Sequence, residues 1–200
     1  MTEIAALILA AGAASRFRAA AGAAGPITKL VALLDGKPLV RRVAEAALGS
    51  QARPVVVVTG HARAEVEAAL AGLAVRFVHN EDFATGLASS LRAGVAALPK
   101  TTNGALVLLG DMPRVSSELI DLMIAAQAQA PQAKALAPVF AGQRGNPALI
   151  ARGLFPAVMS LSGDVGARAL LAAAGSDIVE VSVDDAAITY DVDTPDALNG

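Results

Sequence analysis

The sequence predicts an α/β fold in which buried strands alternate with amphipathic helices around a sheet. Short apolar runs recur along the chain, and the stretches between them are amphipathic, as expected for crossover helices. Hydrophobic residues make up 54% of the chain and aromatic residues 3%, a composition typical of α/β proteins and too apolar for a disordered chain. Because 200 residues suffice for one sizeable core, we expect residues 1–200 to form a single domain.

Composition and charge exclude several classes of function. The formal net charge is −2 with the signs interspersed, which argues against a nucleic-acid partner or a membrane surface. The absence of cysteine excludes disulfides, thiolate chemistry and zinc–cysteine sites. No run of about 18 apolar residues is present, and Glu3 stands where a signal peptide would be basic. We therefore expect a cytoplasmic protein.

The first part of the chain alternates strands and helices. The uninterrupted run Ile4–Ala10 predicts the first strand, and four consecutive valines after Pro54 predict a fully buried one. Pro38 suits the first turn of a helix, and Ser116 or Ser117 can cap another by accepting from free N–H groups. The expected strands are 4–10, 54–59, 75–78 and 105–109, and the expected helices are 38–47, 62–71, 86–98 and 116–130.

The second part continues with shorter elements. Two strands separated by a glycine-rich turn are followed by two helices and two late strands. Thr194 can cap a final short helix. The expected strands are 135–140, 147–150, 178–183 and 188–192, and the expected helices are 154–159 and 165–174.

The loop after the first strand suggests a phosphate site. The chain breaks at Gly12, then carries Ser15, Arg16 and, further on, Lys29. Such a turn can point backbone N–H groups at a phosphate, and two cations can neutralise it. The loop lacks the glycines of a dinucleotide fingerprint and the Gly-Lys-Ser/Thr of a P-loop. Alternatively, Arg16 and Lys29 are ordinary surface cations.

Polar side chains also follow other strands. In open α/β sheets, ligands bind beyond the carboxyl ends of the strands, where Asn80 and Asp111 are expected. A carboxylate there can hold Mg²⁺, which needs only one or two protein carboxylates; alternatively, Asp111 satisfies N–H groups of its own turn. His61 and His79 each follow a strand and are interpreted as turn residues.

Taken together, short motifs in a fixed order extend over nearly the whole chain. They are Leu9-Ala10-Ala11-Gly12-x-x-Ser15-Arg16, Lys29, Gly36-x-Pro38-Leu39, Gly86-Leu87-Ala88-Ser89-Ser90-Leu91, Asp111-Met112-Pro113, Arg144-Gly145-Asn146-Pro147, Gly163-Asp164-x-Gly166-Ala167-Arg168 and Asp191-Val192-Asp193-Thr194-Pro195. This order resembles the MobA-like nucleotidyltransferases, and most closely the molybdenum cofactor cytidylyltransferases.

The resemblance implies a three-layer, Rossmann-like nucleotidyltransferase fold, with a mostly parallel central sheet that is mixed at one edge and flanked by helices. It implies that Arg16, Lys29 and Asp111 are catalytic and that Asp111 and Asp193 hold Mg²⁺, with Mn²⁺ as the alternative. The nucleotide side would comprise Leu9, Ala10, Ala11, Gly12, Ser15, Arg16, Lys29, Gly86, Ser89, Ser90 and Asp111. The acceptor side would comprise Arg144, Asn146, Asp164 and Arg168.

The implied reaction moves CMP from CTP to the terminal phosphate of the molybdopterin cofactor and releases pyrophosphate. Alternatives are a GTP-dependent enzyme, another phosphorylated acceptor, or a non-catalytic cofactor carrier or chaperone. A molybdenum hydroxylase or its maturation protein is the implied transient partner. The chain departs from the family at Arg18, where the family has glycine, and in the long insert 19–28.

Overall fold

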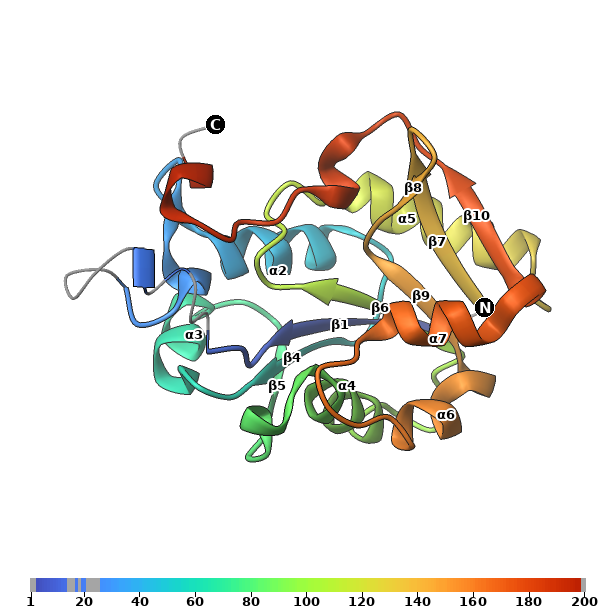
Figure 1. Ribbon diagram of the computed structural model, residues 1–200, viewed down its shortest axis with the longest axis horizontal. Helices are drawn as coiled ribbons and strands as arrows, with labels where there is room; N and C mark the ends of the chain where they lie inside the picture. Colours follow the sequence, from blue (N-terminus) through green and yellow to red (C-terminus); the bar gives the residue numbers. More distant parts are fainter. Residues whose placement is uncertain (1–2, 14–16, 18, 21–25, 199–200) are drawn as a thin grey trace.

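The computed structural model describes residues 3–13, 17, 19–20 and 26–198, arranged around a central sheet (Figure 1). The sheet order is β10-β7-β9-β6-β1-β4-β5, with β8 paired to β7. Only β9 and β8 run antiparallel to their described neighbours, so the sheet is mostly parallel and mixed toward one edge, as predicted. Its strands are β1 (Ile4–Ala10), β4 (Val55–Thr59), β5 (Arg76–His79), β6 (Gly104–Leu109), β7 (Ala135–Phe140), β8 (Gln143–Arg144), β9 (Ala148–Ala151) and β10 (Ile178–Ser182).

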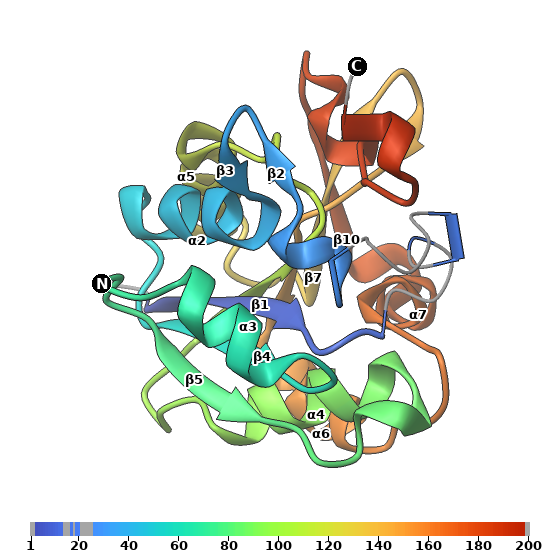
Figure 2. The same ribbon diagram turned by 90° about the vertical axis from the view of Figure 1, so that its left-hand side faces the viewer.

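Helices cover both faces of this sheet, which gives the three layers seen in Figure 2. On one face lie α2, α3 and α5, and on the other lie α4, α6 and α7. The helices are α2 (Leu39–Gly49), α3 (Arg63–Ala69), α4 (Leu87–Ala96), α5 (Ser117–Gln129), α6 (Phe155–Met159) and α7 (Ala167–Ala174). The 3₁₀ turns are η1 (Lys29–Val31), η2 (Phe83–Thr85), η3 (Arg152–Leu154), η4 (Gly175–Asp177), η5 (Ala186–Thr189) and η6 (Pro195–Leu198).

The central strand β1 is buried along its whole length because both of its faces are covered. Successive side chains of a strand point to opposite faces, so Ile8 packs into the core beside α2 and α5, while Leu7 packs into the core beside α4. Parallel neighbours β4 and β6 pair with β1 on either side. The ends of these three strands therefore meet at one edge of the sheet.

Most predicted elements are present with ends shifted by one or two residues. The expected cap of α5 is confirmed: Ser116 Oγ accepts from the Leu119 N–H at 3.2 Å. The final helix is a 3₁₀ turn that follows Thr194.

The predicted strand 188–192 is wrong. Residues Ala186–Thr189 instead form the 3₁₀ turn η5, because the Asp185 carboxylate accepts from the Ala187 N–H at 2.8 Å and the Tyr190 N–H bonds back to Ala187. Local hydrogen bonds thus replace a sheet ladder.

A small hairpin was not predicted. It consists of β2 (Leu33–Leu34) and β3 (Lys37–Pro38), joined through Asp35 and Gly36 at φ angles of 50° and 76°. Asp-Gly between two short runs is the typical signal of such a turn, since both central residues need positive φ. The hairpin is separate from the main sheet and lies beside α2 (Figure 2).

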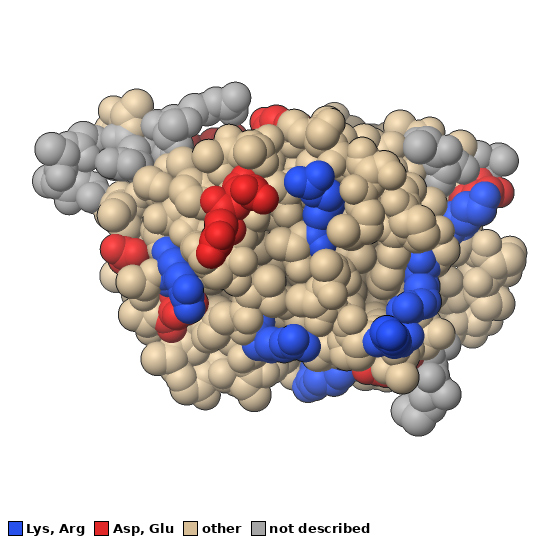
Figure 3. All heavy atoms as spheres, turned by 90° about the horizontal axis from the view of Figure 1, so that it is seen from below, with Lys and Arg blue, Asp and Glu red and all other residues tan. Residues whose placement is uncertain are grey.

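The surface shows no long apolar helix and a scattered charge pattern. Within the described ranges, every helix is too short or too polar to cross a membrane. Lys and Arg side chains are spread over the face below the sheet, with Asp and Glu among them and uncharged surface between (Figure 3).

Candidate active site

Three chain segments bring one lysine and two aspartates together at the carboxyl edge of the sheet. Lys29 opens η1, whose first turn is held by the buried Thr28 hydroxyl accepting from the Leu30 N–H at 3.4 Å. Asp111 follows the end of β6, and Asp193 comes from the carboxy-terminal segment. The Lys29 Nζ lies 2.7 Å from Asp111 Oδ2 and 2.6 Å from Asp193 Oδ1. We call these three residues the Lys29 cluster.

The carboxy-terminal segment is fixed to this edge by backbone bonds. The Val192 N–H donates to the Asp111 carbonyl at 3.1 Å, so the chain between Asp191 and Asp193 is tied directly to the end of β6. On the same segment, the Ile188 carbonyl accepts from the Asn146 N–H at 2.8 Å. These bonds explain how residues more than forty positions apart build one site.

The electrostatics of the Lys29 cluster keep its lysine charged. Burial by itself lowers the pKa of Lys29, but the adjacent Asp111 and Asp193 carboxylates outweigh burial and hold the pKa above its ordinary value of 10.5. Burial, with the negative charges of Asp193 and Asp111, raises the pKa of the nearby Asp191 above its ordinary 3.8. Two carboxylates thus contact the ammonium and the carboxyl of Asp191 is close enough to sense all three charges, so carboxyl groups outnumber cations among these four side chains.

The Lys29 cluster fits a hard divalent cation. Asp111 Oδ1 is buried and has no hydrogen-bond partner among the residues that the structure describes. Such an atom is costly unless a ligand satisfies it. Carboxylate oxygens are ligands that Mg²⁺ and Mn²⁺ accept. The described part of the chain contains no group of three or more His, Cys, Asp or Glu side chains able to surround an ion, so water and phosphate would complete its shell.

Two adjoining cavities open beside the Lys29 cluster. The first, the loop cavity, has a volume of about 660 Å³ and is lined by the Gly12 loop, Lys29, Asp111 and the start of α4. The second, the strand cavity, has a volume of about 440 Å³ and extends over β6 toward Asn146 and Asp191. Four residues line both cavities: Leu9, Leu87, Leu109 and Asp164.

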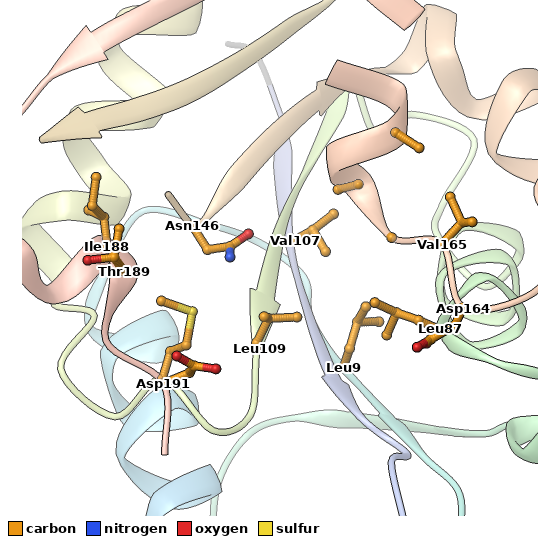
Figure 4. A pocket seen from close by; sticks show the side chains of 14 residues that line it. Leu9, Leu87, Val107, Leu109, Asn146, Asp164, Val165, Ile188, Thr189 and Asp191 are labelled. Carbon is orange, nitrogen blue, oxygen red and sulfur yellow. The ribbon is translucent and has the colours of Figure 1, made fainter. Parts of the chain in front are cut away.

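The strand cavity has an apolar floor and polar ends (Figure 4). Leu9, Val107 and Leu109 project from β1 and β6 between the two ends. Leu87 and Asp164 lie at one end; Asn146, Ile188, Thr189 and Asp191 lie at the other. The described residues that line this cavity include no Lys or Arg.

The structure brings most of the predicted site residues to these cavities. The loop cavity is lined by Leu9, Ala11, Gly12, Lys29, Gly86, Ser90, Asp111 and Asp164, and the strand cavity by Leu9, Asn146 and Asp164. Ser15, Arg16 and Arg18 lie outside the described residues, as do residues 21–25 of the insert and the side chain of Arg168. The roles proposed for those side chains stay predictions.

Four of the described predicted residues line neither cavity, and one of them, Asp193, instead contacts Lys29. Ala10 is buried within β1. The Arg144 Nε donates to Glu180 Oε1 at 2.6 Å, in a pair whose side chains are about half exposed. Ser89 is 4% exposed and supports the wall from behind: its Oγ accepts from the Asn80 amide at 2.8 Å and donates to the Gly86 carbonyl at 2.8 Å. For Ser89 the structure supports a positioning role.

The strand-cavity residues that sequence reasoning missed include Ile188, Thr189 and Asp191. Asp191 had a signal, because it stands two residues before the predicted ligand Asp193. Asn80 was noted only as a polar strand end, and it bonds both Ser89 and Ser90. Neither His61 nor His79 lines the two cavities.

A layered α/β fold with paired cavities and a lysine–carboxylate cluster at the strand ends defines a protein of the nucleotide-binding α/β class. Residues 6–179 match the MobA-like NTP transferase domain, and the chain belongs to this family of nucleotidyltransferases, as the motif order implied.

Two curated proteins are similar to this chain over different lengths. Nicotine blue oxidoreductase of Paenarthrobacter nicotinovorans is 33% identical over 198 residues, which cover 96% of this chain and 93% of that protein. Bifunctional protein GlmU of Paracidovorax citrulli is 35% identical over 130 residues. That match covers 63% of this chain but only 26% of GlmU, so the chain spans about a quarter of that relative.

Solved structures share the fold over almost the entire chain. Rv0371c from Mycobacterium tuberculosis H37Rv superposes with a TM-score of 0.83 at 26% identity and covers 99% of this chain and 96% of its own. A nucleotidyl transferase from Methanothermobacter, Mth528, has the same TM-score and identity, with 98% and 94% covered. These similarities confirm the predicted fold class.

Proposed function

We propose that this protein is a divalent-metal-dependent cytidylyltransferase that transfers CMP from CTP to the terminal phosphate of the molybdopterin cofactor. One observation carries the proposal: two cavities, sized for two substrates, meet beside the Lys29 cluster. A transferase needs its donor and its acceptor side by side, with cationic charge where the phosphates meet.

The loop cavity supports a nucleoside triphosphate as the donor. Backbone around Gly12 borders the cavity, and a Cβ added at Gly12 would contact nothing within 4 Å, so a ligand can approach this backbone closely. Lys29 supplies a held ammonium, and Asp111 with Asp193 would hold the metal ion. Rv0371c has been solved in complex with manganese, and a CMP-KDO synthetase of the same fold, 16% identical, has been solved with CTP.

The strand cavity supports a flat heterocyclic acceptor. Its apolar floor suits the faces of a pterin, while the oxygens of Asn146, Asp164, Thr189 and Asp191 can accept hydrogen bonds from ring N–H and amino groups. Because Lys29 lines the loop cavity, the proposal puts the acceptor's phosphate at the wall that the two cavities share, on the side of the Lys29 ammonium.

The chemistry follows from this placement. An oxygen of the acceptor phosphate bonds to the α-phosphorus of CTP while the bond from that phosphorus to the bridging oxygen breaks, and pyrophosphate leaves. A phosphate monoester is already anionic, so no strong base is required and the residues act by positioning and by charge. The Lys29 ammonium neutralises phosphate oxygens, and a bound Mg²⁺ or Mn²⁺ would add Lewis-acid charge at the same place.

The direct test is turnover. The purified protein is incubated with CTP, MgCl₂ or MnCl₂ and molybdopterin cofactor, and pyrophosphate release is measured. The proposal predicts release that requires all three components, with a higher kcat/KM for CTP than for GTP. Preference for GTP would instead make the protein a guanylyltransferase, and no turnover with any common nucleoside triphosphate would refute the enzyme.

A second candidate is an oxidoreductase, because the relative that matches nearly the whole chain carries that name. The strand cavity also suits a flat dye-like heterocycle. The loop without a dinucleotide fingerprint counts against it. Consumption of a reduced nicotinamide nucleotide with nicotine blue, without pyrophosphate release, would establish this activity in place of ours.

A non-catalytic carrier is the third candidate. It makes one distinct prediction: Asp111→Ala would leave biological activity intact. Under our proposal, the same substitution abolishes transfer while the protein stays folded.

A further inference from the structure

The loop between α6 and α7 is locked onto the first turn of α4 by backbone contacts. Glycine is required where they meet: a Cβ at Gly86 would lie 2.4 Å from the carbonyl carbon of Gly163, which is backbone and cannot yield. Gly86 itself has a φ of 110°, and Gly163 has a φ of 73°. We call residues 163–166 the clamp loop.

The clamp loop also caps α4. Gly86 is the N-cap residue and offers no side chain to the free N–H groups of the first turn. The Gly163 carbonyl fills that place and accepts from the Ala88 N–H at 3.1 Å. The helix that borders the loop cavity is therefore completed by a residue of the loop between α6 and α7.

Two further contacts hold the same surfaces together. A Cβ at Gly166 would lie 2.7 Å from Leu87 Cδ2, so the end of the clamp loop packs closely on that side chain. The Arg92 guanidinium, one turn further along α4, donates to the Leu161 carbonyl at 3.3 Å. The contact therefore extends over more than one turn of the helix.

The contact joins the linings of the two cavities, and Leu87 of α4 lines both. Gly86 and Ser90 of the α4 start line the loop cavity, and Val165 and Gly166 line the strand cavity. Asp164, between the clamp glycines, lines both. The backbones of Gly86 and Gly163 touch with no side chain between them. A shift of the first turn of α4 must therefore move the clamp loop.

We propose that Gly163 is a positioning residue that couples the two cavities: nucleotide binding against α4 fixes the clamp loop and thereby places Asp164 for the acceptor. This inference rests on the function proposed above, with CTP in the loop cavity and the acceptor in the strand cavity. Such coupling is reciprocal, so the acceptor tightens nucleotide binding by the same factor as the nucleotide tightens acceptor binding.

Hydrogen exchange of the clamp-loop amides tests the coupling, and a thermal shift records whether CTP binds. In the wild-type protein, CTP with MgCl₂ should slow exchange at residues 163–166 by about tenfold. The test variant is Gly163→Val, because a β-branched residue does not tolerate positive φ and must leave this conformation. The matched control is Gly142→Val, in the turn between β7 and β8: its φ is 78°, and both glycines have open space around a Cβ.

We expect Gly142→Val to keep the CTP-induced protection and Gly163→Val to lose it while still binding CTP. In turnover, Gly163→Val should raise the KM for the acceptor by about tenfold and change kcat less than about twofold. Gly166→Ala, whose Cβ meets only the flexible end of Leu87, should weaken the protection partially and serves if Gly163→Val does not fold.

The outcomes separate this inference from the proposed function. If CTP binds wild-type protein but clamp-loop exchange is unchanged, or if Gly163→Val keeps full protection, the coupling is refuted and the cytidylyltransferase is not. If CTP does not bind, the cytidylyltransferase fails, and the exchange is measured with the nucleoside triphosphate that does raise the Tm. If no nucleoside triphosphate binds, both the proposed function and the coupling are refuted.

Discussion

Replacing Lys29 by methionine removes the cation from between two carboxylates. The bond to Asp111 joins side chains that are 13% and 18% exposed, and a charge-assisted bond of this kind contributes about 1.5–3 kcal/mol. Asp193 is 48% exposed, so solvent screens its part to about 0–1 kcal/mol. Because burial of the Lys29 ammonium opposes both of these contributions, we expect Lys29→Met to lower the free energy of unfolding by about 2 kcal/mol, which corresponds to a Tm lower by about 4–8 °C.

Urea denaturation at pH 7 measures this loss, and pH gives a second check. The pKa of Lys29 is raised above its ordinary 10.5, so its stabilisation is complete below pH 10.5 and is lost as pH rises through the folded-state pKa. The difference in the free energy of unfolding between the wild-type protein and Lys29→Met should therefore disappear at high pH.

A surface pair in the same protein provides the control. Lys134 Nζ lies 2.8 Å from Asp177 Oδ2, but the side chains are 56% and 47% exposed. Double-mutant cycles with Lys→Met and Asp→Asn should give a coupling of about 1.5–2 kcal/mol for Lys29 with Asp111 and below about 0.5 kcal/mol for the control pair. Equal couplings would refute the argument from burial.

Three further predictions concern the same edge of the sheet. Asp111→Ala should lower kcat/KM for transfer about a thousandfold, because it removes charge placed at the phosphates. The circular dichroism spectrum should stay unchanged, and a loss below tenfold would contradict the proposed role of Asp111 at the phosphates. Asp191→Asn should raise the Tm at neutral pH. Burial and the neighbouring carboxylates raise the pKa of Asp191, so ionising this carboxyl above its ordinary pKa of 3.8 lowers the stability of the wild-type protein. Below pH 3.8 the gain in Tm should vanish, and a lower Tm of the variant at about pH 7 would contradict the prediction. Ser89→Ala should lower the free energy of unfolding in urea by about 1–3 kcal/mol, since it removes two hydrogen bonds of the Ser89 hydroxyl, one from the Asn80 amide and one to the Gly86 carbonyl, each contributing about 0.5–1.5 kcal/mol. Ser90→Ala should cost less, because it removes the one bond from the Asn80 amide to the Ser90 hydroxyl; equal losses would show that the extra bond of Ser89 does not matter.

Buried strands were predictable because their pattern has one physical cause. A run such as Val55–Thr59 is apolar on both faces, and only a covered strand accommodates that. The predicted strand 188–192 (Ile-Thr-Tyr-Asp-Val) shares only its β-branched residues with such a run, and the carboxylate of Asp185 starts a local turn just before it by accepting from the Ala187 N–H. That competition depends on geometry, and residue type alone does not decide it.

The site was predictable where a residue ends a strand and unpredictable where long-range contacts place it. Lys29 and Asp111 were found because charges after buried strands gather at one edge. Arg144 and Asn146 belong to one motif, yet Arg144 pairs outward with Glu180 while Asn146 lines the strand cavity. The difference comes from the β8 turn and the bond to Ile188, which no local pattern encodes.

The antiparallel direction of β9 decides which segments of the chain border the strand cavity. Because β9 runs against β6, the segment that precedes it, around Asn146, reaches the same edge as the segments that follow the parallel strands. Asn146 and the 188–191 segment are joined to each other by backbone, apart from β1 and the Gly12 loop. Under the proposed function, acceptor preference can therefore be changed in these two segments while the Gly12 loop is kept, which makes them the place to exchange sequences when engineering a new acceptor.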